Sequence, residues 1–234
     1  MTENVSPEIA DPPVETDGSA ARAEWYPTPE GVPLELIDRP VELVDKSFAE
    51  HLGTQNTPSR VVARVLHERG SVAVADIGCG TGNTLFTLGE SVGLENVRMI
   101  GISLEDHSGS SANPGTRAAC IATETTAPLI DYHVGDATHM PEIPTASQDV
   151  VLSYNSMYHS GQPQEWLSEM IRITRPGGTI LFNTDPGQLD MGVLDSLRGL
   201  GYSVLDSFSL PEPSGDVRFF RVDVPLDGIT TNVS

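Results

Sequence analysis

The sequence has little cysteine and little positive charge. Cys79 and Cys120 are its two cysteines, and Cys79 lies inside a glycine-rich segment, so we expect no disulfide framework and a reducing, cytoplasmic compartment. The 13 Lys and Arg residues stand against 33 Asp and Glu residues, which gives a net charge of −20. Because phosphate backbones are bound by clustered basic side chains, this balance argues against nucleic acid and anionic membranes as partners.

The sequence also lacks the patterns of membrane proteins, secreted proteins and metal sites. No apolar run approaches the roughly 20 residues that a membrane-spanning helix needs. Residues 1–23 are acidic and contain several prolines, without the basic start and apolar core of a signal peptide, and we expect a disordered tail there. The histidines other than His159 show no metal-ligand spacing, which predicts no metal site: His51, His67, His107, His133 and His139.

Apolar residues at helical spacing follow this tail. They occur in the segment 42–52 and again after Thr57-Pro58, where a proline suits the first turn of a helix. Gly70 is placed to end the second helix. We therefore expect residues 24–70 to form an N-terminal helical lid segment that covers one side of a pocket.

From residue 71 onward, short apolar runs alternate with helical patterns. This alternation is typical of an α/β fold with a parallel sheet covered by helices on both faces. The last two runs, joined by a Pro- and Gly-rich turn at 211–215, predict an antiparallel hairpin that closes the sheet. The expected strands are 72–76, 97–102, 130–134, 149–153, 179–183, 202–210 and 217–224, and the expected helices are 84–92, 116–127, 164–174 and 191–200.

A glycine-rich segment, Asp76-Ile77-Gly78-Cys79-Gly80-Thr81-Gly82, lies between the first expected strand and the first helix after it. Glycines there let the backbone turn tightly and approach a ligand closely. The spacing differs from the G-x-G-x-x-G pattern of dinucleotide-binding loops, and the acid two residues before the first glycine would repel a pyrophosphate. A ligand that carries an ammonium group fits this carboxylate better.

Three segments resemble the class I S-adenosylmethionine-dependent methyltransferases of small-molecule type: VADIGCGTGNT (74–84), VGDATHMP (134–141) and IRITRPGGTILF (171–182). The resemblance implies a Rossmann-like, seven-stranded, mostly parallel sheet and S-adenosylmethionine as cofactor. It assigns the acid and the glycines of the first segment to the methionine part of the cofactor, and Asp136 and Ala137 to its adenine. The cofactor-binding residues expected beside these two are Asp76, Gly78, Cys79, Gly80, Asn83 and Ser153.

The chain departs from that family after the second expected strand. Family members carry an acid two residues after the glycine that ends this strand, where it binds both ribose hydroxyls. Here Ser103 stands at that position, and its hydroxyl has no charge and no bidentate reach. Glu105 or Asp106, just beyond, is expected to substitute if the strand end is bulged. The polar segment 107–115 is either a flap over the ribose or a surface insertion.

Polar and aromatic residues follow the fourth expected strand, in Ser153-Tyr154-Asn155-Ser156-Met157-Tyr158-His159. Ligands of open α/β sheets bind beyond the carboxyl ends of the strands, so we assign this segment to the acceptor. His159 is either a general base or a cap for the following turn, and Tyr154 is a second catalytic candidate. The residues assigned to the acceptor are Tyr154, Asn155, Tyr158, Trp25 and Tyr26, with packing as the alternative for the tyrosines and loop support for Asn155.

The combined expectation is that residues 71–234 form a methyltransferase-like domain that binds S-adenosylmethionine and methylates a small molecule, with natural-product biosynthesis as one setting. No Asn-Pro-Pro-Tyr motif follows the fourth strand, which disfavours methylation of nitrogen in nucleic acid or protein. Two alternatives stay open. One is an enzyme that uses the cofactor without methyl transfer, by cyclising its aminocarboxypropyl chain or rearranging another substrate; the other is a non-catalytic cofactor-binding domain. The expected partner is a small molecule, and a homodimer is compatible with the sequence.

Overall fold

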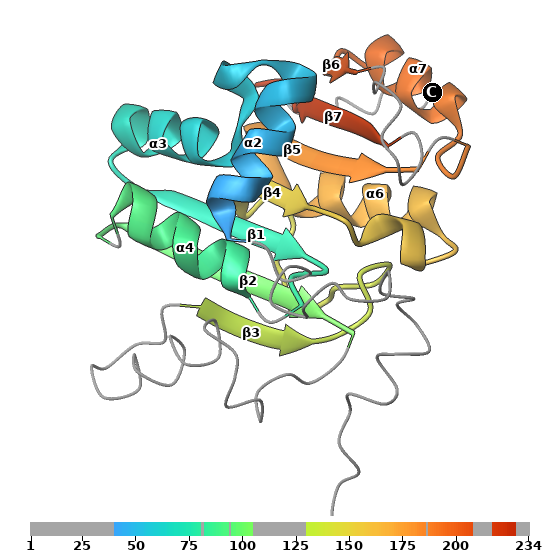
Figure 1. Cartoon of the computed structure of the whole chain (residues 1–234). Coiled ribbons are helices and arrows are strands. Elements are labelled where there is room, and N and C mark those ends of the chain that lie inside the picture. Colours follow the sequence, from blue (N-terminus) through green and yellow to red (C-terminus); the bar gives the residue numbers. More distant parts are fainter. Residues whose placement is uncertain are drawn as a thin grey trace, which may run out of the picture. The chain divides into compact units, whose positions relative to one another are not determined.

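A single mixed sheet runs through the part of the chain that the computed structural model describes (Figure 1). That part comprises residues 40–80, 82–93, 95–104, 130–185, 187–207 and 217–227, all within the unit Asp38–Ser234. The strands are β1 (Val72–Ile77), β2 (Val97–Ser103), β3 (Ile130–Val134), β4 (Gln148–Ser153), β5 (Thr174–Thr184), β6 (Ser203–Asp206) and β7 (Arg218–Asp223).

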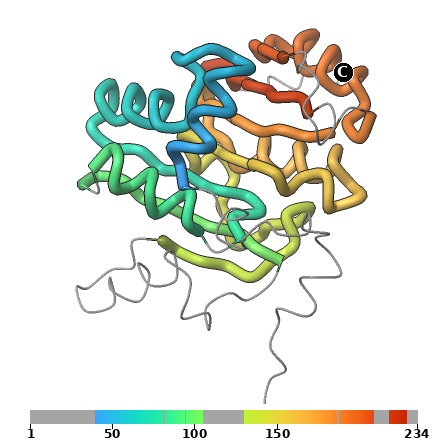
Figure 2. Tube along the Cα trace, in the orientation of Figure 1, coloured from blue at the N-terminus to red at the C-terminus, as the bar shows by residue number. Residues whose placement is uncertain are grey.

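The strands are hydrogen-bonded in the order β3-β2-β1-β4-β5-β7-β6. The first five are parallel, and β7 runs antiparallel to both β5 and β6. Figure 2 shows β7, from the end of the chain, beside β5. This topology confirms the predicted mostly parallel sheet with a C-terminal antiparallel hairpin. The strand order reverses between β1 and β4, which is where ligands of open α/β sheets bind.

Helices cover both faces of the sheet, because apolar side chains point alternately to the two faces along each strand. In β1, Val72 and Val74 belong to one buried apolar cluster, whereas Ala75 and Ile77 belong to another. The first cluster packs under α2 (Val41–Leu52), α3 (Pro58–Arg69) and α4 (Asn83–Val92). The second packs under α6 (Pro163–Ile173) and α7 (Met191–Gly199).

The ends of α3 follow the signals in the sequence. The Thr57 hydroxyl accepts a hydrogen bond from the Arg60 N–H at 3.4 Å, and Pro58 occupies the first turn. Gly70 ends the helix with φ +75°, and its N–H donates to the Leu66 carbonyl oxygen at 2.8 Å. The predicted start and end of this helix are therefore confirmed.

The predicted fifth strand, 179–183, is too short. β5 begins at Thr174, so Pro176-Gly177-Gly178 lies within the strand. Val224 extends the pairing there. The Gly177 N–H donates to the Val224 carbonyl oxygen at 3.0 Å, and the Val224 N–H donates to the Gly178 carbonyl oxygen at 2.9 Å. A positive φ of 72° at Gly177 lets the chain bend at this point.

β7 is shorter than its predicted range of 217–224. β6 covers Ser203–Asp206 of the predicted range 202–210, of which residues 208–210 lie outside the described part of the chain. The predicted helix 116–127 and the predicted turn 211–215 lie outside the described residues. Within the described ranges, no helix has both the length and the apolarity to cross a bilayer.

A buried carboxylate fastens the amino-terminal edge of the sheet, opposite the glycine-rich segment. Asp149 in β4 has a side chain that is 3% exposed. Its Oδ1 lies 2.8 Å from Arg69 Nη1 and 3.2 Å from Arg175 Nη1, and its Oδ2 accepts from the Ala73 N–H at 2.8 Å. One carboxylate thus joins α3, β1, β4 and β5.

Asp149→Ala is expected to lower the free energy of unfolding by about 2–4 kcal/mol, because it leaves the two arginines and a buried N–H without their acceptor. Urea unfolding followed by circular dichroism measures this. Asp195→Ala is the matched control, since Asp195 is 75% exposed in its ion pair with Arg198. The control should change stability by less than about 1 kcal/mol. Equal losses in the two variants would contradict the anchoring role of Asp149.

Candidate functional site

The glycine-rich segment forms a tight loop between β1 and α4. Gly78, Gly80 and Gly82 have φ values of +80°, +55° and +81°, a region that glycine adopts without steric cost. The N–H groups of Gly78 and Cys79 both donate to the Ile102 carbonyl oxygen at 2.8 Å. The loop is therefore turned over the carboxyl end of β2, the neighbouring parallel strand.

Gly78 is also the point where the loop after β1 meets the loop after β4. A Cβ at Gly78 would stand 2.4 Å from Cβ and 2.6 Å from Oγ of Ser156, and 3.2 Å from the Trp166 ring. The Ser156 hydroxyl donates to the Ile77 carbonyl oxygen at 3.1 Å and lies 3.0 Å from the Ser153 hydroxyl. Nothing in the spacing of Ser156 along the sequence predicts this contact.

The side of the loop at Gly80 is open. Among the described residues, no heavy atom lies within 4 Å of the position that a Cβ of Gly80 would take, whereas a Cβ at Gly101 would stand 2.8 Å from Cys79 Sγ. The Tyr132 hydroxyl donates to the Gly80 carbonyl oxygen at 2.7 Å, so β3 supports the loop from across β2. Asp76, 4% exposed, places a carboxylate at the end of β1.

This loop fits the methionine part of S-adenosylmethionine. Asp76 could supply a negative charge for the ammonium group, and the position beside Gly80 could admit a ligand. Asn83 begins α4. The positive end of the helix dipole at this point suits a carboxylate.

Ser103 is the residue described at the ribose end of the expected site. Ser103 is the last residue of β2 and is 5% exposed, and its carbonyl oxygen accepts from the Gly135 N–H at 2.9 Å. A hydroxyl therefore stands where the resemblance predicts a carboxylate. Glu105, the predicted substitute, lies outside the described residues.

The expected adenine residues follow β3. Asp136 is exposed, and its Oδ1 accepts from both the N–H and the hydroxyl of Thr138 at 2.8 Å. These two bonds hold the pKa of the Asp136 carboxyl below its usual value, which keeps it ionised at neutral pH. Ala137 is buried, 6% exposed. The loop thus offers a carboxylate beside an apolar residue, which suits an amino-bearing aromatic ring.

Asn155, just after β4, is held by its neighbour strand. It has a positive φ of 52°. Its N–H donates to Asn183 Oδ1, and Asn183 Nδ2 donates to its Oδ1, both at 2.7 Å. Asn183, in β5, is 1% exposed. These contacts favour the loop-supporting role for Asn155.

Tyr154 points to the helix that the sequence assigns to the lid. Its hydroxyl lies 3.0 Å from the Ser47 hydroxyl of α2. Its ring centroid lies 6.2 Å from that of Phe48 and 6.3 Å from that of Phe219. Packing against α2 and β7 therefore accounts for part of its surface.

His159 ends a short 3-10 helix, η3 (Met157–His159), beyond the carboxyl end of β4. Its ring centroid lies 4.1 Å from that of Tyr158. Burial lowers the pKa of His159, and the Asp185 carboxylate opposes that shift. A histidine with a lowered pKa is neutral at pH 7, the form that accepts a proton.

The structure brings most of the expected residues to one edge of the sheet. The carboxyl ends of the parallel strands β1 to β5 meet there (Figure 1). Ser156 joins the ends of β1 and β4, Asn183 joins those of β4 and β5, and Gly135 joins those of β2 and β3. Trp25 and Tyr26 lie outside the described residues.

Comparison with known families gives one match that spans this edge. A family model described as "Methyltransferase domain" matches residues 75–182. The matched range contains the glycine loop, the loop after β3 and the segment after β4.

Curated relatives match parts of the chain. A "Probable tocopherol O-methyltransferase, chloroplastic" of Oryza sativa subsp. japonica is 28% identical over 117 residues, which are 50% of this chain and 30% of that protein. A malonyl-(acyl-carrier protein) O-methyltransferase of Yersinia pestis is 42% identical over 67 residues, 29% of this chain and 23% of that protein. The chain thus spans less than a third of the length of these two relatives.

Solved structures share the fold. Magnesium protoporphyrin IX methyltransferase from Synechocystis PCC 6803, with bound S-adenosylmethionine, superposes with a TM-score of 0.52 at 13% identity. The match covers 88% of this chain and 91% of that one. At this identity the likeness concerns the fold alone.

Gly80→Arg is expected to abolish binding of S-adenosylmethionine while the fold stays intact, because the new side chain fills the open position and brings a positive charge to the cofactor's ammonium group. Isothermal titration measures the binding. Gly201→Arg is the matched control: Gly201 has φ +90° and no heavy atom within 4 Å of its Cβ position, and it precedes the amino end of β6. Both variants carry the strain of about 1–2 kcal/mol that a side chain meets at positive φ. An unchanged titration of Gly80→Arg would overturn the assignment of the loop.

Proposed function

Because residues 75–182 match a methyltransferase domain, we propose that the chain transfers the methyl group of S-adenosylmethionine to a hydroxyl oxygen of a small molecule. The observation that carries this proposal is His159, a half-buried histidine with a lowered pKa beyond the end of β4. A base of this kind serves an acceptor that must lose a proton as it is methylated.

The residues of the glycine loop hold the methionine end of the cofactor in this proposal. Asp76 binds the ammonium group, and the first N–H groups of α4 bind the carboxylate. Gly78, Cys79 and Gly80 let the cofactor lie against the loop backbone. When bound, S-adenosylmethionine supplies a methyl group that its sulfonium already activates.

The other half of the cofactor lies along the ends of β2 and β3 in this proposal. Ser103 offers its hydroxyl to the ribose, and Asp136 accepts from the adenine amino group. Ala137 packs against the adenine ring. Asn83 and Ser153, at the start of α4 and the end of β4, complete the contacts that we assign to the cofactor.

His159 takes the proton of the acceptor's hydroxyl group while that oxygen forms its bond to the methyl carbon. The products are the methyl ether, the demethylated cofactor, and a protonated His159 that returns its proton to solvent. Tyr158, whose ring lies against His159, and Tyr154, which contacts α2, are the aromatic side chains that we assign to the acceptor.

A small acceptor agrees with the charge of the chain, since a net charge of −20 disfavours nucleic acid. The names of two curated relatives support oxygen as the acceptor atom, because both are O-methyltransferases. The tocopherol relative also supports natural-product biosynthesis as the setting, which we include in the proposal.

His159→Gln is expected to lower kcat by about 10²–10⁴-fold and leave the Kd of S-adenosylhomocysteine unchanged, because a general base acts on the acceptor and not on the cofactor. In the unchanged protein, kcat/KM should rise with pH through an apparent pKa below that of an exposed histidine. Burial disfavours the protonated form, so activity is lost on acidification at a lower pH than it would be with an exposed histidine. His159→Gln should lack this acid limb.

Asp185→Asn is the companion variant. The Asp185 charge raises the pKa of His159, so its removal should move the acid limb to lower pH. An acid limb that persists in His159→Gln would exclude His159 as the base. Incubation with S-adenosylmethionine alone is a further check, because release of methylthioadenosine would contradict methyl transfer as the reaction.

A further inference from the structure

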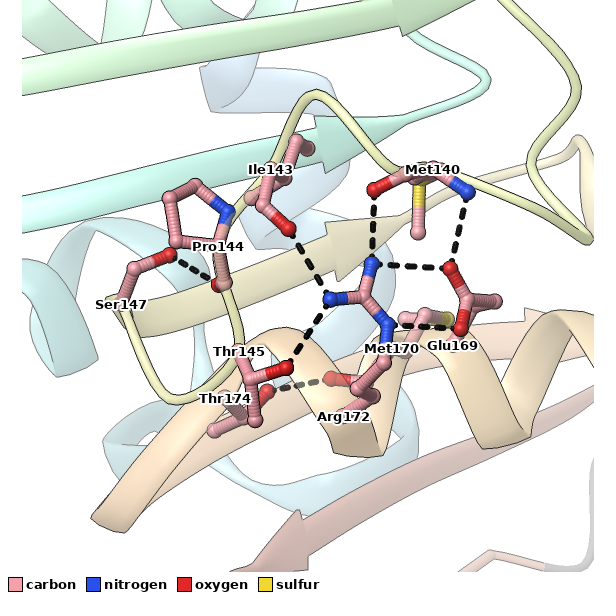
Figure 3. A network of polar contacts seen from close by, with 9 residues as sticks. All are labelled: Met140, Ile143, Pro144, Thr145, Ser147, Glu169, Met170, Arg172 and Thr174. Carbon is pink, nitrogen blue, oxygen red and sulfur yellow. Dashed lines mark hydrogen bonds and ion pairs between the residues drawn. The ribbon is translucent and has the colours of Figure 1, made fainter.

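Arg172 in α6 joins its own helix to the loop that follows β3 (Figure 3). Its Nε and Nη2 donate to the two carboxylate oxygens of Glu169, at 2.7 and 2.9 Å. Its Nη1 donates to the Ile143 carbonyl oxygen and the Thr145 hydroxyl, at 3.0 and 3.2 Å, and Nη2 also donates to the Met140 carbonyl oxygen at 2.6 Å. A guanidinium has five N–H donors in one plane, and these contacts use all of them.

Glu169 completes this network from the same helix. Its Oε2 accepts from the Met140 N–H at 2.8 Å, so both backbone polar groups of Met140 are bound to α6. Arg172 holds the pKa of the Glu169 carboxyl below its usual value, and Glu169 raises that of Arg172. The side chain of Glu169 is 16% exposed and that of Arg172 is 30% exposed, so the pair is partly shielded from water and stays charged near neutral pH.

Apolar burial fixes the depth of the same loop. Met140 and Ile143 are fully buried, and Ala137 is 6% exposed. All three belong to the cluster that contains Met170 of α6. Apolar contacts slide more easily than directional hydrogen bonds, so the network of Arg172 sets the position of the loop along the helix.

Asp136 lies between two points where this loop is attached. Before it, the Gly135 N–H binds the end of β2 at Ser103, at 2.9 Å. After it, Met140 is bound to Glu169 and Arg172. Because the loop is attached on both sides of Asp136, the Asp136 carboxylate is held in a fixed position.

The uncharged side chain of Ser103 makes the position of Asp136 more important for binding the nucleoside. Ser103 itself offers a neutral hydroxyl to the ribose, and a charge-assisted contact is about twice as strong as a neutral one. More of the selectivity for the nucleoside then depends on Asp136 and on what positions it.

We infer that Glu169 and Arg172 are a positioning pair that sets the Asp136 carboxylate for the adenine amino group, and thereby sets the preference of the site for adenine. The inference rests on the cofactor placement in the proposed function. In this inference both side chains act through the loop backbone at Met140 and Ile143, which they contact directly.

The test compares two ligands that differ at the purine. S-adenosylhomocysteine carries the amino group, and S-inosylhomocysteine carries a carbonyl oxygen in its place, which a carboxylate disfavours. Arg172→Ala should raise the Kd of S-adenosylhomocysteine by about tenfold and that of S-inosylhomocysteine much less. The ratio of the Kd of S-inosylhomocysteine to that of S-adenosylhomocysteine should therefore fall toward one. The KM for S-adenosylmethionine should rise while kcat stays within about twofold, because the reacting end is untouched.

Arg198→Ala is the matched control. Arg198 pairs with Asp195 and Asp206 on α7 and β6, so the variant loses an arginine network of similar kind away from the site. It should keep both Kd values. If Arg172→Ala fails to fold, Glu169→Gln keeps the shape of the pair, removes its negative charge and should show the same fall in preference.

Ser103→Asp separates positioning from affinity. Added to Arg172→Ala, it should tighten both ligands equally, because the new carboxylate binds the ribose that they share, and it should leave the lost preference for adenine unrestored. Equal weakening of both ligands in Arg172→Ala, or an unchanged preference, would overturn the inference. A starting protein that binds neither ligand would instead contradict the cofactor site itself.

Discussion

At Gly78 the backbone has room for a hydrogen atom and nothing larger. A Cβ there would overlap Ser156, which itself donates to Ile77, and the φ of +80° adds a second requirement for glycine. Because of this contact, the loops after β1 and β4 lie against each other. The carboxylate of Asp76 and the 3-10 helix that carries His159 are thereby held on one framework, although they are far apart along the chain.

The two ends of the cofactor site are supported differently. The methionine end combines a buried carboxylate, three glycines at positive φ and the start of α4. The nucleoside end has a neutral Ser103 and relies on a loop fastened to β2 and to α6. A contact that lacks charge contributes less, so the fixed position of Asp136 gains importance. This explains why a network outside the site bears on cofactor recognition.

Local patterns in the sequence were sufficient for most of the fold. Thr57-Pro58 and Gly70 mark α3, and the glycine spacing after a buried run marks the loop between β1 and α4. The supporting contacts were not predictable, since each joins residues that only the strand order makes neighbours. From the sequence alone, Asn183 is one more residue of a buried strand, and its role depends on β5 lying beside β4. Arg172 is similarly predicted only as a surface helix residue, and its role depends on the loop after β3 folding over α6.

The chemistry of methyl transfer explains why rigidity matters here more than any single catalytic group. Alignment of two reacting atoms can supply effective molarities of about 10⁵–10⁸ M, whereas a general base contributes about 10²–10⁴-fold. Most of the rate must therefore come from loops that hold cofactor and acceptor in line. Ser156, Asn183 and Arg172 each fasten one such loop to a neighbouring element of the fold. In the proposed reaction, residues that contact neither substrate therefore affect the rate as much as His159 does.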